Sequence, residues 1–363
     1  MTARSTSFPL AAGRKTNEVS RTALRVWFTT LAALILVIVT VGGATRLTGS
    51  GLSITEWNLV GGVLPPLTDA QWQAALAKYR EIPQYQVVNR GMSLDAFKTI
   101  FWWEWAHRML GRLIGLVALV PLVVWSWRGQ LTGWIRTRAV LIFLGICAQG
   151  VLGWWMVKSG LTERTDVSQY RLMAHLCLAF ALLGYIVWTL ADLKRERDFA
   201  RPQDVMLNTV SGRQKALGVL LVPLIFAQIA LGALVAGMKA GLLHNTWPLM
   251  GDQLIPSGLA VMEPFWRNIF ENATMVHFNH RTFGIVVAAL TLWHVLRVVM
   301  RADDGSLRRN ALMLGALVIA QFALGVWTIV AGVPLNLALI HQVLAAILLS
   351  ASVWHAHGLI RGR

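Results

Sequence analysis

The stretch LRVWFTTLAALILVIVTVGGA, residues 24–44, is apolar and long enough to cross a membrane as one helix. About 20 residues, each rising about 1.5 Å along a helix, span the hydrocarbon core of a bilayer, which is roughly 30 Å thick. Seven further blocks of this kind follow it, at residues 102–127, 139–157, 171–191, 216–238, 275–299, 310–331 and 337–357. The sequence therefore predicts an all-α integral membrane protein with eight transmembrane helices.

Composition and charge agree with a membrane protein. Only 14% of the 363 residues are charged, whereas soluble domains carry about a quarter. The net charge of +16 could suggest binding to nucleic acid, but its distribution argues against that partner. If the N-terminus is cytoplasmic, the segments on the inner side hold 20 of the 33 Lys and Arg residues but only 7 of the 17 acids. This positive-inside asymmetry predicts that both termini are cytoplasmic.

The two halves of the chain carry the same landmarks in the same order, which predicts an internal duplication of a four-helix unit. The matching landmarks are His107-Arg108 with Gly111 and His280-Arg281 with Gly284, AQGVLG at 148–153 and AQFALG at 320–325, and Gly51-Leu52 before Glu56-Trp57 with Gly241-Leu242 before Thr246-Trp247. Four crossings return the chain to the same face. We therefore expect two four-helix bundles related by a pseudo-twofold axis along the membrane normal.

The predicted domain organisation follows from the spans. We expect a cytoplasmic tail at 1–23, an N-terminal bundle at 24–191, a cytoplasmic linker at 192–215, a C-terminal bundle at 216–358 and a second tail at 359–363. Two outer loops are long, at 45–101 and 239–274, and the first contains an amphipathic stretch at 71–79 that is typical of a surface helix. Long loops on one face suggest that the chemistry is on that face. Two cysteines, Cys147 and Cys177, fall within spans and are expected to pack as small apolar residues.

Four histidines share one depth in the predicted bilayer. The second, fourth, sixth and eighth spans run from outside to inside, and each has a histidine four to six residues from its start: His107, His175, His280 and His341. That spacing places them roughly 6–9 Å below the outer surface. A single histidine in a span is often only hydrogen-bonded to a neighbouring helix, but four in this arrangement indicate function.

Two helices of a bundle that project histidines inward at one depth can bind a flat macrocycle between them, and neutral imidazole is a common axial ligand of haem iron. Zinc or di-iron sites would need carboxylates or thiolates nearby, and the second span offers only Glu104. We therefore predict two bis-histidine haem sites. The repeat pairs His107 with His175, and His280 with His341.

Three arginines are candidates for the carboxylates of a haem, its propionates. Arg108 and Arg281 each follow a ligand candidate, and Arg46 lies at the outer end of the first span. A guanidinium can bind a propionate through two hydrogen bonds, although each arginine could instead extend to lipid phosphates.

The other histidines carry weaker expectations. His277, one turn outward from His280, is expected to line the pocket. Near the inner face, His294, His355 and His357 could line a quinone or electron-entry site, or could simply be interfacial, and His244 in the outer loop has no assigned role.

Several long strings are distinctive. They are GGATRLTGSGLSITEW at 42–57, PPL at 65–67, NRGMSLDAFKTIFWWEWAHRMLGR at 89–112, AGLLHNTWPLM at 240–250, FEN at 270–272 and VHFNHR at 276–281. In these strings the sequence resembles the haem A synthase family of aerobic bacteria and mitochondria. The resemblance covers nearly the whole chain after the first 20 residues.

The resemblance implies oxidation of the methyl group at ring position 8 of haem O to a formyl group, giving haem A for cytochrome oxidase. It also implies that His107 and His175 hold haem O or haem A, and that His280 and His341 hold a haem B that serves electron transfer. Some relatives have a cysteine pair in the first outer loop, whereas residues 45–101 contain no cysteine. The chain therefore resembles the cysteine-free group.

By this resemblance Glu56, in the first outer loop, matches the family's acidic residue implicated in catalysis. A carboxylate near the haem edge could accept a proton during oxidation, or help to remove water from a hydrated aldehyde. Its alternative role is structural, as a loop carboxylate that caps a turn or pairs with Arg46. In the second copy Thr246 takes its place, as expected if only the N-terminal half performs chemistry.

The main alternative function is a di-haem b-type membrane electron carrier, and a weaker one is a haem or quinone transporter. Bis-histidine ligation leaves no open iron position for oxygen and so favours the carrier, whereas the family strings favour the enzyme. The implied partners are haem O and a haem O synthase, an unidentified electron donor and the lipid bilayer, with a homo-oligomer left open. The expected location is the plasma (inner) membrane of a bacterium, or alternatively the mitochondrial inner membrane.

Overall fold

The computed structural model describes residues 18–58, 61–162, 164–199 and 210–361. Within these residues it contains helices and no β-strand, and eight of the helices are long and apolar enough to cross a membrane. These eight are α1 (Arg21–Leu47), α3 (Leu94–Trp127), α4 (Gly133–Lys158), α5 (Gln169–Phe199), α6 (Gly212–Gly237), α8 (Ala273–Arg301), α9 (Gly305–Val330) and α10 (Leu335–Arg361). The predicted all-α class with eight spans is confirmed.

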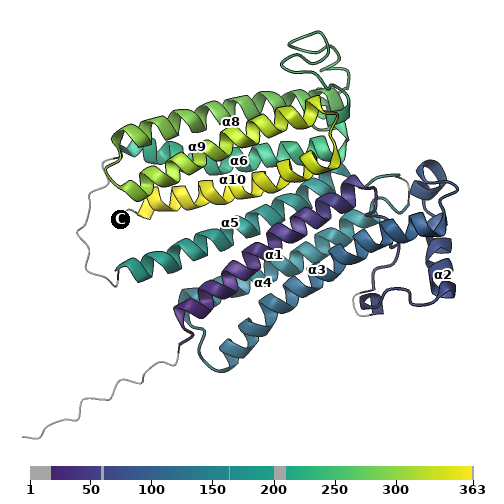
Figure 1. The fold of residues 1–363 in the computed structure, drawn as a ribbon, viewed down its shortest axis with the longest axis horizontal. Coiled ribbons are helices and arrows are strands. Elements are labelled where there is room, and N and C mark those ends of the chain that lie inside the picture. Colours follow the sequence, from purple (N-terminus) through teal and green to yellow (C-terminus); the bar gives the residue numbers. More distant parts are fainter. Residues whose placement is uncertain (1–17, 59–60, 163, 200–209, 362–363) are drawn as a thin grey trace, which may run out of the picture.

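The helices form two groups of four that lie side by side (Figure 1). In the N-terminal group, α1, α3, α4 and α5 contact one another in a ring, and α6, α8, α9 and α10 do the same in the C-terminal group. Helices α1 and α5 also contact the second group through α6 and α10. The histidine-bearing helices of each ring, α3 with α5 and α8 with α10, stand at opposite corners. The pseudo-twofold relation between the groups stays a prediction.

Much of each span faces outward. Between 11% and 39% of the most apolar stretch of each span is buried within the protein, and α4 has the lowest share. Its exposed side chains include Leu141, Leu144 and Val151. Apolar surface on this scale is stable only against lipid, because water would oppose its exposure. The molecule is a multi-span membrane protein.

Capping residues explain where several helices begin. Ser20 caps α1, Ser93 caps α3 and Asn272 caps α8, each through a side-chain oxygen that accepts a hydrogen bond from a backbone N–H of the first turn. As a result α3 starts at Leu94, eight residues before the predicted start at 102. The hydropathy pattern locates only the part of a helix that lies in lipid, so it missed these first turns.

The first turns of α3 support a small extramembrane unit. The amphipathic stretch predicted at 71–79 is helix α2 (Asp69–Arg80), which is followed by η2 (Gln84–Val88). Trp72 and Tyr79 of α2 pack against Phe97 and Phe101 of α3. Burial raises the pKa of Tyr79, so its hydroxyl stays protonated and can donate to Gln84 Oε1 at 2.9 Å. This unit packs against the N-terminal end of α3 (Figure 1).

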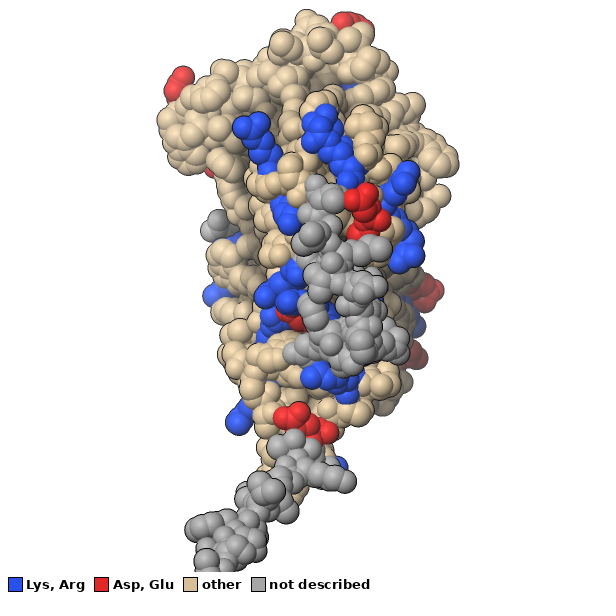
Figure 2. Space-filling model, turned by 90° about the vertical axis from the view of Figure 1, so that its left-hand side faces the viewer, with Lys and Arg blue, Asp and Glu red and all other residues tan. Residues whose placement is uncertain are grey.

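Both long loops lie at the same end of the bundles, which we call the loop end (Figure 1). The second loop contains η3 (Ala240–Leu242) and α7 (Trp266–Glu271). Figure 2 shows the opposite end, where Lys and Arg side chains gather. That distribution matches the charge asymmetry of the sequence, and the cytoplasmic placement of this end stays a prediction. Most of the first predicted tail (residues 1–17), the centre of the linker (200–209) and the last two residues (362–363) lie outside the described residues.

Candidate functional site

A cavity of about 630 Å³ lies within the N-terminal bundle. His107 of α3 and His175 of α5 both line it, so the first predicted histidine pair meets in one cavity. The wall deeper in the bundle is apolar and includes Ile114 and Leu182. A volume of this size is typical of small-molecule sites, which range from roughly 300 to 1,000 Å³.

Each of the four candidate ligands lies against a glycine of a neighbouring helix, where even one added carbon atom would crowd the imidazole. A Cβ added to Gly42 would lie 2.8 Å from His107 Nε2, and one added to Gly153 would lie 3.3 Å from His175 Cε1. In the C-terminal bundle, a Cβ on Gly232 would lie 3.0 Å from His280 Cε1, and one on Gly325 would lie 2.9 Å from His341 Cε1. Because glycine has no side chain, each of these positions leaves space for the imidazole ring, and this arrangement occurs at all four histidines.

Three of these glycines are preceded, one helical turn earlier, by a glutamine that holds the histidine-bearing helix. The amide nitrogen donates to the backbone carbonyl of the histidine, from Gln149 to His175 at 3.0 Å, from Gln228 to His280 at 2.9 Å and from Gln321 to His341 at 3.1 Å. Residues four apart lie on one face of a helix, so the glutamine and the glycine contact the same histidine. At the corresponding position α1 has Ile38, whose side chain packs over Gly111.

The sequence contains a signal for these glutamines. The string AQ-x-x-LG occurs at 148–153, 227–232 and 320–325. The first and third occurrences are landmarks of the predicted duplication, and the second, in α6, lies outside those landmarks. All three play the same part in the structure.

Arg108 ties the first long loop to α3. Its Nη1 donates to the carbonyl of Glu56 at 2.7 Å, and its Nη2 donates to the carbonyl of Ile54 at 2.7 Å and to Glu104 Oε1 at 2.6 Å. Glu104 is 2% exposed and also accepts hydrogen bonds from Ser53 Oγ and the Ile54 N–H, both at 2.8 Å. The charge of Arg108 is therefore balanced inside the protein. Sequence reasoning mentioned Glu104 only as an isolated acid and missed this role.

Arg281 holds the second long loop in a similar way, but without an acid. Its Nη2 donates to the carbonyls of Thr246, Pro248 and Leu249 at 2.9, 3.2 and 3.1 Å. Its guanidinium lies 4.9 Å from the centre of the Trp247 ring, as that of Arg108 lies 5.1 Å from the ring of Trp57. Its Nη1 is buried and has no hydrogen-bond partner among the described residues.

Arg46, at the loop end of α1, lines the 630 Å³ cavity. Its backbone carbonyl accepts a hydrogen bond from the Gly49 N–H at 3.0 Å, but the described part of the chain gives its guanidinium neither a hydrogen bond nor an ion pair. Asp166 also lines the cavity, but its carboxylate pairs with Lys239 at 2.7 Å. The propionate contacts expected for Arg46, Arg108 and Arg281 stay predictions. Of the three arginines, only Arg108 forms an ion pair among the described residues.

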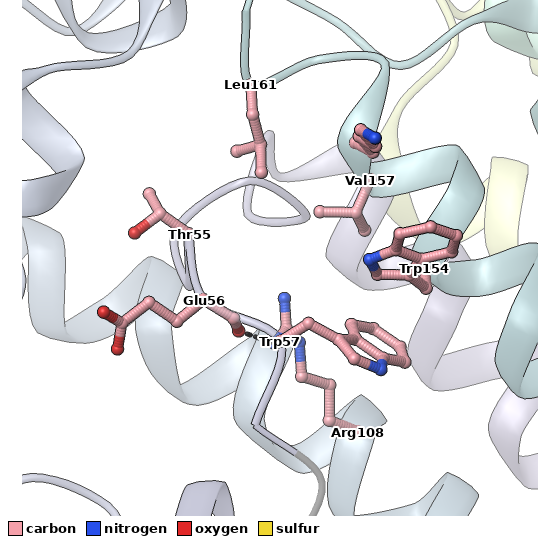
Figure 3. Close-up of a pocket in the computed structure, with 8 residues that line it drawn as sticks. Thr55, Glu56, Trp57, Arg108, Trp154, Val157 and Leu161 are labelled. Atoms are coloured by element: carbon pink, nitrogen blue, oxygen red, sulfur yellow. Dashed lines mark hydrogen bonds between the residues drawn. The ribbon is translucent and has the colours of Figure 1, made fainter.

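Glu56 lies at the edge of the site. Together with Trp57 and Arg108 it lines a smaller pocket of about 210 Å³, and it is not among the residues that line the larger cavity. Its carboxylate points away from Trp57 and Arg108 (Figure 3) and accepts a hydrogen bond from Lys78 Nζ of α2 at 2.6 Å. The partner of Glu56 is therefore Lys78 rather than Arg46. Lys78 is 22 residues further along the chain, and no sequence pattern linked the two.

The remaining histidines fall into three places. His277 is buried near His244, with 6.3 Å between ring centres. At the other end of the C-terminal bundle, His294 and His355 share a hydrogen bond of 2.9 Å between their Nε2 atoms, and His357 contacts Asp192 at 2.8 Å. The expected quinone or electron-entry role of His294, His355 and His357 stays a prediction.

Comparison with known proteins identifies the family of the chain. A family model described as cytochrome oxidase assembly protein matches residues 25–353. The protein named Heme A synthase from Parvibaculum lavamentivorans is 45% identical over 344 residues, which cover 95% of this chain and 96% of the relative. The protein of the same name from Azorhizobium caulinodans is 47% identical over 95% of this chain and 96% of the relative. That from Rhodopseudomonas palustris strain BisA53 is 48% identical over 91% of this chain and 89% of the relative. The chain therefore belongs to the haem A synthase family of cytochrome oxidase assembly proteins.

Proposed function

We propose that the protein converts haem O to haem A by oxidising the methyl group at ring position 8 to a formyl group, and so supplies haem A to cytochrome oxidase. The observation that carries the proposal is the cavity that two glycine-backed histidines line in the N-terminal bundle. The names of the relatives support the same reaction.

The N-terminal cavity fits a haem substrate. The two imidazoles that would hold its iron, from His107 and His175, come from helices at opposite corners of the bundle and line one cavity. The apolar wall around Ile114 and Leu182 suits the macrocycle, and Arg46 near the loop end suits a carboxylate. These residues would bind and orient haem O.

The C-terminal bundle would hold a resident haem B between His280 and His341. Gln228 and Gln321 fix the backbone of both ligands, and Gly232 and Gly325 make room for their rings. Bound there, haem B supplies one-electron transfer.

Glu56 is proposed to accept a proton from the substrate. Conversion of a methyl to a formyl group removes two hydrogens and adds one oxygen, so protons leave the substrate, and a carboxylate near the reacting edge is suited to accept one. The pocket at Glu56 shares Trp57, Arg108 and Trp154 with the haem cavity. A rotation of its side chain away from Lys78 would direct the carboxylate toward that shared wall.

A di-haem electron carrier is the second candidate, because the glycine-backed histidines recur in both bundles. Extraction of the haems followed by chromatography separates the two functions. Protein produced in cells that make haem O should contain haem B together with haem O or haem A. Haem B alone at both sites, despite a supply of haem O, would show a carrier and not an enzyme.

Replacing Gly42 with alanine is expected to remove the substrate haem and to leave haem B in place. The new methyl carbon would lie 2.8 Å from His107 Nε2, the atom that would bind iron, so the ring must move. The matched control is Gly111→Ala, where a Cβ would meet only Ile38 at 3.7 Å, an ordinary contact. Alanine favours a helix over glycine by about 1 kcal/mol, so helix destabilisation does not explain a loss of haem. Full haem content in Gly42→Ala would contradict the assigned ligand.

We also propose that both termini face the cytoplasm and that the protein lies in the plasma membrane of a bacterium. The basic end in Figure 2 supports this orientation. A haem O synthase and an electron donor are the expected partners. Labelling of introduced cysteines from one side of the membrane would test the orientation, and reaction of a loop-end cysteine only from the cytoplasm would contradict it.

A further inference from the structure

The N-terminal cavity reaches the lipid-facing side of α4. Cys147, Gly150, Val151 and Trp154 follow one another every three or four residues and therefore lie on one face of this helix. All four line the cavity, and all four are exposed, Val151 by 61% and Trp154 by 41%. Because the outward side of α4 faces lipid, the cavity is open to the bilayer along this face.

Two glycines border this opening, one on each of two neighbouring helices. Gly115 of α3 and Gly150 of α4 both line the cavity, and a Cβ added to either would meet no atom from another part of the described chain within 4 Å. The space in front of both backbones is therefore not filled by a side chain. We call this gap between Gly115 and Gly150 the slit.

The other three sides of the bundle are filled by side chains or covered by the second bundle. Between α1 and α3, Ile38 packs over Gly111, and between α4 and α5, Leu182 packs against Gly145. The side between α1 and α5 is covered by α6 and α10 (Figure 1). The slit is therefore the passage from the cavity to the lipid that these contacts leave.

The second bundle has an aromatic ring where the slit has a glycine. In the duplicated string, AQGVLG at 148–153 and AQFALG at 320–325, Gly150 corresponds to Phe322. The ring of Phe322 packs with its edge against Trp247, with 5.6 Å between ring centres. One turn nearer the loop end the order is reversed, since Trp154 corresponds to Val326. The deeper position is thus a glycine in the N-terminal bundle and a phenylalanine in the C-terminal bundle.

We propose that the slit binds the isoprenoid chain of the substrate and so selects a haem that carries this chain for the N-terminal bundle. The identity of the haems rests on the proposed function: haem O bears a hydroxyethylfarnesyl chain, which haem B lacks. The chain is apolar, so a path from the cavity to the lipid suits it. It would leave the cavity past Gly115 and Gly150 and lie along the exposed face of α4. In the C-terminal bundle, Phe322 stands at the corresponding place, which suits a haem without the chain.

The first test compares the binding of haem O and haem B to the N-terminal site. Full-length protein carrying His280→Ala, in which the C-terminal site lacks one proposed ligand, is produced without haem and titrated with each compound. We expect a preference for haem O of roughly tenfold or more, because haem B lacks the methylene groups that the slit would bury. Gly150→Phe, which copies the residue of the second bundle, should weaken binding of haem O at least about tenfold and leave binding of haem B unchanged.

Leu144→Phe is the matched control. Leu144 is 54% exposed on α4 and does not line the cavity, so the same ring at this position should leave both affinities unchanged. Equal affinities of the His280→Ala protein for haem O and haem B would overturn the inference. An undiminished preference for haem O in Gly150→Phe would also overturn it.

Labelling of Cys147 tests the slit without changing its glycines, and decides the matter if Gly150→Phe does not fold. Cys147 is exposed beside the slit, whereas Cys177 of α5 does not line the cavity and serves as an internal reference. In the His280→Ala protein, bound haem O should slow the reaction of Cys147 with pyrene maleimide, which partitions into lipid. Bound haem B should not slow it, and the rate at Cys177 should be the same with either haem. Equal rates at Cys147 with haem O and haem B would place the chain elsewhere and overturn the inference.

Failure of the proposed function would give a different result. If the His280→Ala protein bound haem O equally well after His107→Ala was added, the assignment of the N-terminal cavity would be wrong. If binding depended on His107 but haem O and haem B bound with equal affinity, only the role of the slit would be wrong.

Discussion

Replacing His280 with alanine is expected to remove haem B from the purified protein and to leave haem O or haem A in the N-terminal bundle. The substitution would remove one of the two proposed ligands, while the other, His341, would stay fixed by Gln321. The matched variant His107→Ala should give the reverse result. Extraction and chromatography of the haems, with the spectrum of the reduced protein, measure both outcomes.

Added imidazole provides the control for folding. A small ligand can occupy the space left by the side chain, so haem B should return to His280→Gly when imidazole is supplied. Retention of haem B in His280→Ala, together with its loss in His107→Ala, would contradict the assignment of the two bundles.

Replacing Glu56 with glutamine is expected to slow formation of haem A by at least about 100-fold and to leave the content of both haems unchanged. General acid–base groups contribute roughly 10²–10⁴ to rate, and glutamine keeps the shape of the side chain but cannot take up a proton. Glutamine can still accept a hydrogen bond from Lys78, so the loop should keep its structure. The measurement is the rate at which supplied haem O becomes haem A.

Glu81→Gln is the matched control, because it removes the same charge from the end of α2, in the same extramembrane unit. It should convert haem O at the rate of the unmodified protein. If Glu56→Gln also kept that rate, the carboxylate would be structural, as its ion pair with Lys78 already allows.

Much of the fold follows from local sequence. Each span is a long apolar block, and the landmarks repeat in order, so the spans and the four histidines could be predicted from one chain. Whether a segment enters the bilayer depends on its own apolar residues. The direction in which each helix crosses then follows from the number of crossings before it and from the charge asymmetry. The pairing of the histidines rested only on the duplication, and the meeting of His107 with His175 in one cavity agrees with it.

Tertiary contacts across the first loop could not be predicted. The partner of Glu56 is a lysine on α2, and the partner of Arg108 is Glu104, which is held in place by Ser53 and Ile54. These contacts depend on how a long loop folds back over α3, which no periodic pattern encodes. The two loops also give Arg108 and Arg281 different surroundings, because Arg108 pairs with Glu104 whereas Arg281 donates to backbone carbonyls.

A chase with isotope-labelled haem O tests the central claim most directly, namely that the N-terminal bundle holds the haem that changes and the C-terminal bundle the haem that stays. Labelled haem O is supplied to membranes that contain the protein, and the label is followed in each extracted haem over time. We predict that the label passes to haem A, while haem B stays constant in amount and unlabelled. Label that remains in haem O while the protein stays fully loaded, or a loss of haem B that matches the gain in haem A, would contradict the account.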